Sequence, residues 1–179
     1  MGARKMRGEG WTFDGILDVD WQICSFALLR ELRASGVAIT DEELGKYCMV
    51  NVDPEFPKKV KAGDFIVAGD NMGYGHDHDH ACRSIKGAGV AAVLCDSTNG
   101  NFMRNCLDHG LPIIEYPGIR AATKQGDTLE VDLETGTITN ITREKVFHFR
   151  PFPAFLIESI EDGGTYPHLK KEVAAGKYR

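Results

Sequence analysis

The sequence predicts a mixed α/β protein that has parallel strands at its centre and an antiparallel β-hairpin region. Compact apolar segments at residues 63–69, 90–96 and 111–116 have the length and composition of buried strands. Segments with helical spacing join them over short connections, which is typical of a parallel sheet with crossover helices. Beyond residue 126, polar and apolar residues alternate around Gly136, as they do in antiparallel hairpins.

The remaining elements follow from local spacing and from the residues at their ends. Residues 10–20 are expected to form a strand that leads into a turn rich in aspartate. The expected helices span residues 25–36, 40–49, 79–88, 97–110, 154–164 and 166–176. We predict one domain over residues 1–179, in which residues 1–8 form a disordered tail.

The composition favours a cytoplasmic protein that has neither a nucleic-acid nor a membrane partner. The net charge is -5, from 21 basic and 26 acidic side chains, which argues against polyanionic partners. No apolar run approaches the roughly 20 residues that a membrane helix needs. The 5 cysteines are odd in number and dispersed, so we expect reduced thiols and no iron–sulfur ligand set in this chain.

The stretch "GYGHDHDHACRS", residues 73–84, is the strongest candidate for a functional site. It lies after the strand that ends near Gly69 and at the start of the next predicted helix. Ligands bind at this position in open α/β sheets, and the free N–H groups of a helix start attract carboxylates or phosphates. Gly73 and Gly75 would let the backbone approach a ligand closely. The next glycine is Gly87, so the stretch does not fit the dinucleotide-binding pattern.

Residues 69–81, "GDNMGYGHDHDHA", resemble the loop "G-x-N-F-G-C-G-S-S-R-E-H-A" of 3-isopropylmalate dehydratase small subunits, which belong to the aconitase swivel-domain family. Further segments resemble that family in the same order, so the resemblance covers nearly the whole chain. They are "LDVD", "YCMVNVDPEFPKKVKAGDFIVAG", "AGVAAVLCDSTNGNFMRNCLDHGLPIIE", "GDTLEVDLETGTITN" and "FLIESIEDGG". The resemblance implies an aconitase-like swivelling β/β/α domain.

The same resemblance implies the small subunit of a hydro-lyase that dehydrates and rehydrates a small hydroxy-carboxylic acid. The nearest activity is that of 3-isopropylmalate dehydratase, in leucine biosynthesis. A [4Fe–4S] cluster is implied on a partner large subunit, and none is implied on this chain. The expected substrate is a small hydroxy dicarboxylate, such as a citramalate-like or dimethylmalate-like acid. Self-association of the isolated chain is left open.

The loop departs from the family pattern at its functional positions. The serine that acts as the family's base aligns with His76, and the arginine that binds a substrate carboxylate aligns with His78. Because a neutral imidazole is a better base near pH 7 than a hydroxyl group, our hypothesis makes His76 the base. The expected catalytic residues are His76, Asp77 and His78, and the expected substrate-binding residues are Asn71, Gly73, Gly75, His78, Asp20 and Arg30.

Other interpretations of these residues stay open. The loop of a non-catalytic swivel module would hold an anion or a metal ion instead. Imidazoles and carboxylates are good transition-metal ligands, but alternate histidines share one side only in an extended loop, and we assign no metal ligand. Structural roles are expected for several of these residues. We expect His80 to stabilise the helix start, Asp77 or Asp79 to be its N-cap, and Asp18 and Asp20 to hydrogen-bond within a turn. We expect Cys82, Cys95 and Cys106 to pack in the core.

Overall fold

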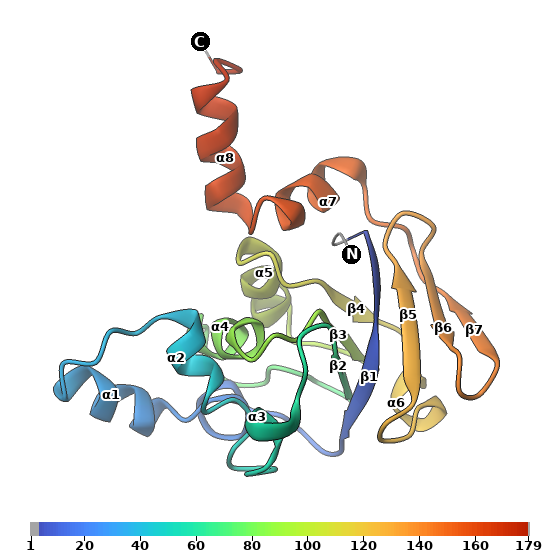
Figure 1. Ribbon diagram of the computed structural model, residues 1–179, viewed down its shortest axis with the longest axis horizontal. Coiled ribbons are helices and arrows are strands. Elements are labelled where there is room, and N and C mark those ends of the chain that lie inside the picture. The colour runs from blue at the N-terminus through green and yellow to red at the C-terminus, as the bar shows by residue number, and fades with distance from the viewer. Residues whose placement is uncertain (1–3, 179) are drawn as a thin grey trace.

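A seven-stranded mixed sheet organises the computed structural model, which describes residues 4–178 (Figure 1). The strand order is β4-β3-β2-β1-β5-β6-β7, in which β1 to β4 run parallel and β1, β5, β6 and β7 pair antiparallel. The strands are β1 (Lys5–Phe13), β2 (Phe65–Ala68), β3 (Ala92–Cys95), β4 (Ile113–Glu115), β5 (Thr128–Asp132), β6 (Thr137–Asn140) and β7 (Lys145–His148). The predicted parallel centre and hairpin region are therefore confirmed.

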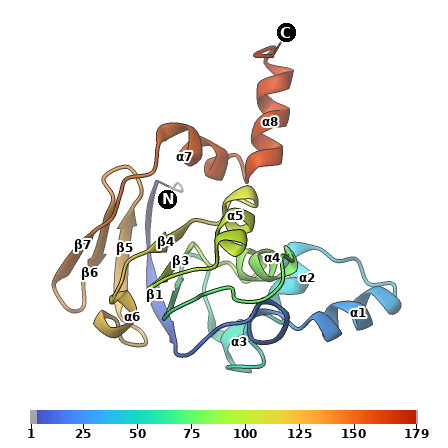
Figure 2. The ribbon, with the colours of Figure 1, turned by 180° about the vertical axis from the view of Figure 1, so that it is seen from behind.

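Helical segments fill the connections between the strands. They are the π-helical turn η1 (Val19–Ile23), α1 (Phe26–Ala34), α2 (Asp41–Gly45), α3 (Phe56–Lys59), α4 (His80–Gly87), α5 (Gly100–Asp108), α6 (Ile119–Ala122), α7 (Ala154–Glu161) and α8 (Thr165–Ala174). Helices α4 and α5 lie on one side of the parallel strands, and the β5–β7 hairpins curl around the other side (Figures 1 and 2). No helix between residues 4 and 178 has the length and apolar character needed to cross a bilayer.

The two faces of the sheet carry separate hydrophobic cores. Successive residues of a strand point to opposite faces, so Ile66 packs with the helices of one core and its neighbour Val67 packs in the other. Both side chains are fully buried. Strands β2 and β3 are thus apolar throughout, which is why they can be recognised in the sequence.

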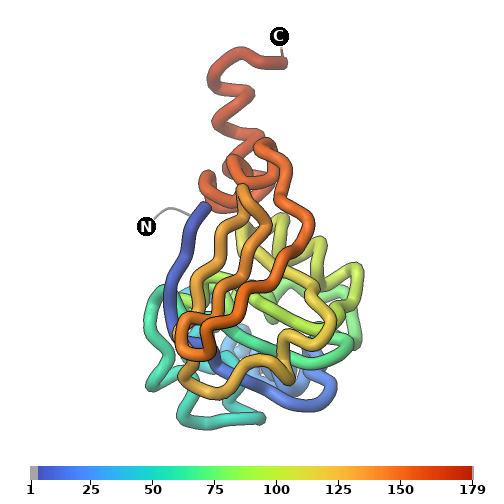
Figure 3. The backbone as a smooth tube through the Cα atoms, turned by 90° about the vertical axis from the view of Figure 1, so that its right-hand side faces the viewer, coloured from blue at the N-terminus to red at the C-terminus, as the bar shows by residue number. Residues whose placement is uncertain are grey.

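Helix α8 stands apart from both cores and projects away from the sheet (Figure 3). None of its residues is buried. Its contact with the end of α7 is polar, since His168 Nδ1 lies 2.8 Å from Asp162 Oδ2 and Lys171 Nζ lies 2.6 Å from Asp162 Oδ1.

The predicted disordered tail is wrong over residues 5–8, while residues 1–3 lie outside the described part. Residues 5–8 belong to β1 and pair with β5 in a register that runs from Lys5 opposite Asp132 to Glu9 opposite Thr128. This strand joins the two halves of the sheet, because its first part pairs with β5 and its second part, from Gly10, pairs with β2. The turn predicted after it is the π-helical turn η1.

Helix α4, which begins directly after the histidines, is fixed by backbone-to-backbone contact with α2. A Cβ added to Gly87 would lie 1.7 Å from the carbonyl oxygen of Asp41, and one added to Gly45 would lie 2.3 Å from the carbonyl carbon of Gly87. Only glycine allows this approach. The contact therefore fixes the position of α4, and with it the end of the segment, residues 70–79, that leads into this helix.

We expect Gly87→Ala to lower the free energy of unfolding by about 1–3 kcal/mol, because the added methyl group forces α2 and α4 apart. Urea denaturation followed by circular dichroism measures this change. The matched control is Gly100→Ala, where an added Cβ meets nothing within 4 Å. The control should change stability by less than about 0.5 kcal/mol. Equal effects of the two substitutions would contradict the close contact.

Candidate functional site

The histidine loop, residues 70–79, connects β2 to α4 and is held on both sides by backbone hydrogen bonds. On one side, Gly73 N and Tyr74 N donate to Leu17 O at 3.0 and 3.1 Å, and Val19 N donates to Tyr74 O at 2.9 Å. On the other side, Met72 N donates to Ser97 O at 3.0 Å. The loop therefore lies at the carboxyl ends of the strands, as predicted, and directly beside the turn η1.

The two glycines of the loop are required by contacts within the protein. Gly73 has a φ of 76°, and a Cβ there would lie 2.0 Å from Cγ of Phe102. Gly75 has a φ of 110°, and a Cβ there would lie 2.7 Å from Oδ2 of Asp18. Both the backbone conformation and the space therefore favour glycine. Their predicted role in binding a ligand is a separate matter, and it stays a prediction.

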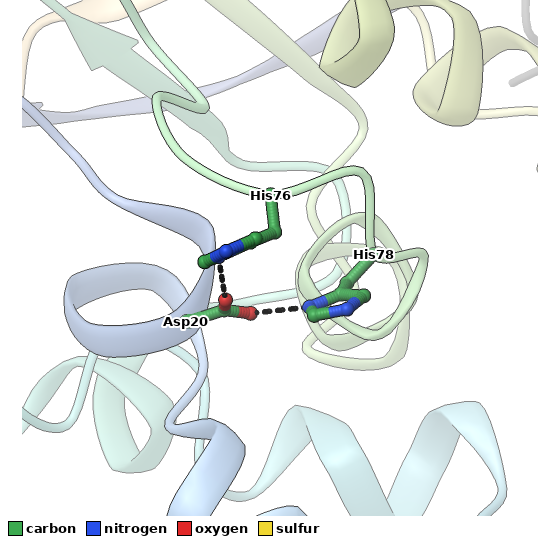
Figure 4. A group of neighbouring side chains, drawn as sticks. All are labelled: Asp20, His76 and His78. Atoms are coloured by element: carbon green, nitrogen blue, oxygen red, sulfur yellow. Dashed lines mark hydrogen bonds and ion pairs between the residues drawn. The ribbon is translucent and has the colours of Figure 1, made fainter.

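Asp20 joins the turn η1 to two histidines of the loop (Figure 4). Its Oδ2 lies 2.8 Å from Nδ1 of His76, and its Oδ1 lies 2.8 Å from Nδ1 of His78. Because a carboxylate only accepts hydrogen bonds, each Nδ1 carries a hydrogen, and Nε2 of each neutral ring keeps its lone pair. One carboxylate therefore orients two imidazoles, with one oxygen for each ring.

The imidazoles of His76 and His78 in the loop and of His80 at the start of α4 form a row that begins in the core and ends in solvent. The ring centroids of His78 and His80 are 5.7 Å apart, and those of His76 and His78 are 5.4 Å apart. Phe26 stacks on His78 at 4.9 Å, with 11° between the ring planes. The side chains of His80, His78 and His76 are 3%, 39% and 78% exposed. The rings of His76, His78 and His80 thus lie on the same side of the backbone, although this segment is not an extended strand.

His80 has the structural role that the sequence predicts. Its Nε2 donates to the carbonyl oxygen of Cys24 at 2.9 Å, which ties the start of α4 to the segment after η1. Burial lowers the pKa of His80, because a charged imidazolium would lose its hydration, and the neutral ring is favoured.

The predicted N-cap at the start of α4 is only half right. Asp79 occupies the N-cap position, but its backbone is helical, with φ -79° and ψ -18°, and its side chain caps no N–H group. A capping side chain usually requires an extended backbone at this residue. Asp77 instead accepts a hydrogen bond from Nδ2 of Asn105 at 2.8 Å.

Of the two aspartates predicted to stabilise the turn, only Asp18 does so. Its Oδ1 accepts from the backbone N–H of Asp20 at 2.7 Å. The prediction for Asp20 is wrong, because its carboxylate turns to the histidines instead.

Two predicted binding residues lie apart from this cluster. Asn71 has a φ of 55°, and its N–H donates to Oγ of Ser97 at 2.9 Å. Arg30 is exposed on α1, and within residues 4–178 no hydrogen bond or ion pair joins it to the loop. Helix α1 contacts the loop through Phe26 instead, which stacks on His78. The only indication of this contact in the sequence is that Phe26 follows Asp20 closely.

Proteins of known name place the chain in a family, although no protein-family model matches it. It is 41% identical over 170 residues to the "isopropylmalate/citramalate isomerase small subunit" of Methanocaldococcus jannaschii, covering 94% of this chain and 96% of that protein. It is also 43% identical over 169 residues to the "3-isopropylmalate dehydratase small subunit" of Moorella thermoacetica, covering 94% and 96%. The chain belongs to the 3-isopropylmalate dehydratase small-subunit family.

The fold of this family member matches a solved relative. The crystal structure of 3-isopropylmalate dehydratase from Methanocaldococcus jannaschii superposes with a TM-score of 0.84 and 31% identity, over 97% of this chain and 98% of that one. The expected aconitase-type swivel fold and the resemblance on which it rested are thereby confirmed.

The cysteines of the chain do not fit the role of iron–sulfur ligands. All five are free and buried, as predicted for the core positions. Burial raises the pKa of Cys24 to about 11 and raises the pKa of Cys48, Cys95 and Cys106 as well. Within residues 4–178, the group of three or more potential ligands that come together is Asp20, His76 and His78, and it contains no cysteine.

We expect the folded protein to resist thiol alkylation, because all five thiols are buried away from the reagent and the reacting form is the thiolate. Iodoacetamide at pH 8 should label none of the five cysteines in native buffer within the time that labels all of them in urea. Intact-mass spectrometry counts the labels. Rapid labelling of one native cysteine would contradict the burial of that thiol.

Proposed function

We propose that the chain is the small subunit of a hydro-lyase that dehydrates and rehydrates a small hydroxy dicarboxylic acid in the cytoplasm, in leucine biosynthesis. The relatives support the reaction class, since they are named as small subunits of 3-isopropylmalate dehydratase or of isopropylmalate/citramalate isomerase. In this proposal a large subunit carries the [4Fe–4S] cluster, because the cysteines of this chain do not suit it.

The observation that carries the proposal is the pair formed by Asp20 and His76. Nδ1 of His76 donates to Oδ2 of Asp20 over 2.8 Å, the side chain is 78% exposed, and Nε2 makes no hydrogen bond within residues 4–178. That atom would remove the carbon-bound proton of the substrate. Asp20 would stabilise the imidazolium that forms and keep the ring in the tautomer that can accept the proton.

A substrate carboxylate would bind beside this base. The backbone N–H groups of Gly75, His76 and Asp77 have no backbone acceptor within residues 4–178. Together with His78 they offer donors for one carboxylate. No Lys or Arg nitrogen in that part of the chain lies within 4.0 Å of the Asp20 carboxylate. A citramalate-like or dimethylmalate-like dicarboxylate therefore fits better than a tricarboxylate.

We expect His76→Ala to lower turnover by about 10²–10⁴-fold, because the base is lost. The measurement is an anaerobic hydration assay of the complex with its large subunit, across unsaturated dicarboxylates and tricarboxylates. The variant should still co-purify with the large subunit. His148→Ala, which removes an exposed histidine of β7, is the matched control and should keep full activity. Unchanged turnover in His76→Ala would disprove the assignment of the base.

We expect Asp20→Asn to lower kcat by about 10²-fold or more with little change in KM, because the amide cannot stabilise the imidazolium. Asp20→Glu should restore part of kcat, since it returns a carboxylate to the histidines. The two variants are compared in the same assay. A wild-type complex with a loaded cluster that turns over none of the acids would instead favour a non-catalytic module that binds an anion or a metal ion.

A further inference from the structure

We propose that Asp20, His76 and His78 form a binding site for one divalent transition-metal ion of the Zn²⁺ type. Two imidazoles and one carboxylate are a ligand set that zinc and iron(II) accept, with the remaining positions open to water or to a carboxylate. The three residues come from two segments that lie far apart in the sequence and are brought together by the fold (Figure 4). A ligand set of this kind is more selective than a group of carboxylates alone.

The geometry of the three residues is close to that of a bound site. One ligand atom from each residue can be chosen so that all lie within 4.8 Å of one another. Ligand atoms at about 2.0–2.2 Å from a tetrahedral zinc ion are about 3.3–3.6 Å apart, so the three side chains would close on the ion by up to about 1 Å. The exposed ring of His76 is free to make this movement, since its contacts within residues 4–178 are with Asp20 and His78.

The other two ligands are held in place by their surroundings. His78 lies between Phe26 and His76, stacked on both. The backbone N–H of Asp20 is fixed by Asp18 at 2.7 Å. Supporting contacts of this kind orient ligands before the ion arrives. His80 is not part of the set, because its Nε2 already donates to Cys24 O.

The charges around the cluster favour a cation. Asp18 lies beside the loop and Asp77 lies within it, and no Lys or Arg nitrogen in residues 4–178 is within 4.0 Å of the Asp20 carboxylate. The two hydrogen bonds to Asp20 leave its negative charge without a permanent positive partner. An ion between the carboxylate and the imidazoles would supply that charge and would present open positions to an anionic ligand.

Metal binding and the base function use the same atoms, so they exclude each other at Asp20. The ion would take the carboxylate oxygens and the nitrogens that otherwise form the hydrogen bonds at 2.8 Å. The metal site is nevertheless independent of the proposed hydro-lyase function, because the isolated chain contains every ligand. Failure of one proposal leaves the other intact.

The test is a titration of the full chain, purified without a histidine tag and stripped with a chelator. Zn²⁺ is followed by isothermal calorimetry, and Co²⁺ by its visible absorption. We expect one ion per chain and no thiolate-to-cobalt charge-transfer band, because the cysteines are buried. Weak or non-stoichiometric binding, or a thiolate band, would overturn the proposal.

Three variants assign the site. His76→Ala, His78→Ala and Asp20→Asn should each weaken Zn²⁺ binding at least about tenfold, and His148→Ala should not change it. Thermal unfolding without metal shows whether each variant keeps the fold. If Asp20→Asn does not fold, His76→Ala decides the test, because the His76 side chain is 78% exposed and its loss should leave the fold intact. Wild-type affinity in His76→Ala, or equal loss in His148→Ala, would overturn the proposal.

Discussion

The site depends on the backbone pairing between residues 17–19 and the histidine loop. This pairing requires the chain to pass close to Asp18 and Phe102, which only the glycines at 73 and 75 permit. Once it forms, the turn η1 lies beside the loop, and Asp20 faces two imidazoles instead of solvent. Helix α4 then begins at a fixed place against α2. The cluster of Asp20, His76 and His78 is thus brought together by backbone packing.

One aspartate between two histidines can serve two kinds of chemistry, and the neighbours decide between them. An imidazole oriented by a carboxylate accepts a proton when its far nitrogen is open to a substrate. The same three groups bind an ion when a cation reaches them first. The relatives are named small subunits, which implies a large-subunit partner whose surface would control that access. The chain alone therefore presents the cluster to solvent, and assembly would change what can reach it.

Much of the architecture could be predicted from local sequence. Strands β2 and β3 are short and apolar throughout, β4 is apolar up to its last residue, Glu115, and the loop after β2 lies at their carboxyl ends as expected. The extension of β1 to Lys5 could not be predicted, because its residues alternate with charges and its partner β5 lies more than a hundred residues away. The hydrogen bonds of Asp20 were equally hidden, since they span 56 and 58 residues of sequence. Local patterns indicate elements, but long-range contacts decide which side chains meet.

The position of β1 has a consequence for how the protein forms on the ribosome. The first strand to emerge lies at the centre of the sheet, and one of its neighbours, β5, is synthesised only at residues 128–132. Until then the parallel half can assemble, but one side of β1 remains an open strand edge. Open edges of this kind attract other chains. Nascent or truncated forms that end before β5 are therefore the stage at which this small subunit is most exposed to aggregation and has most need of a chaperone.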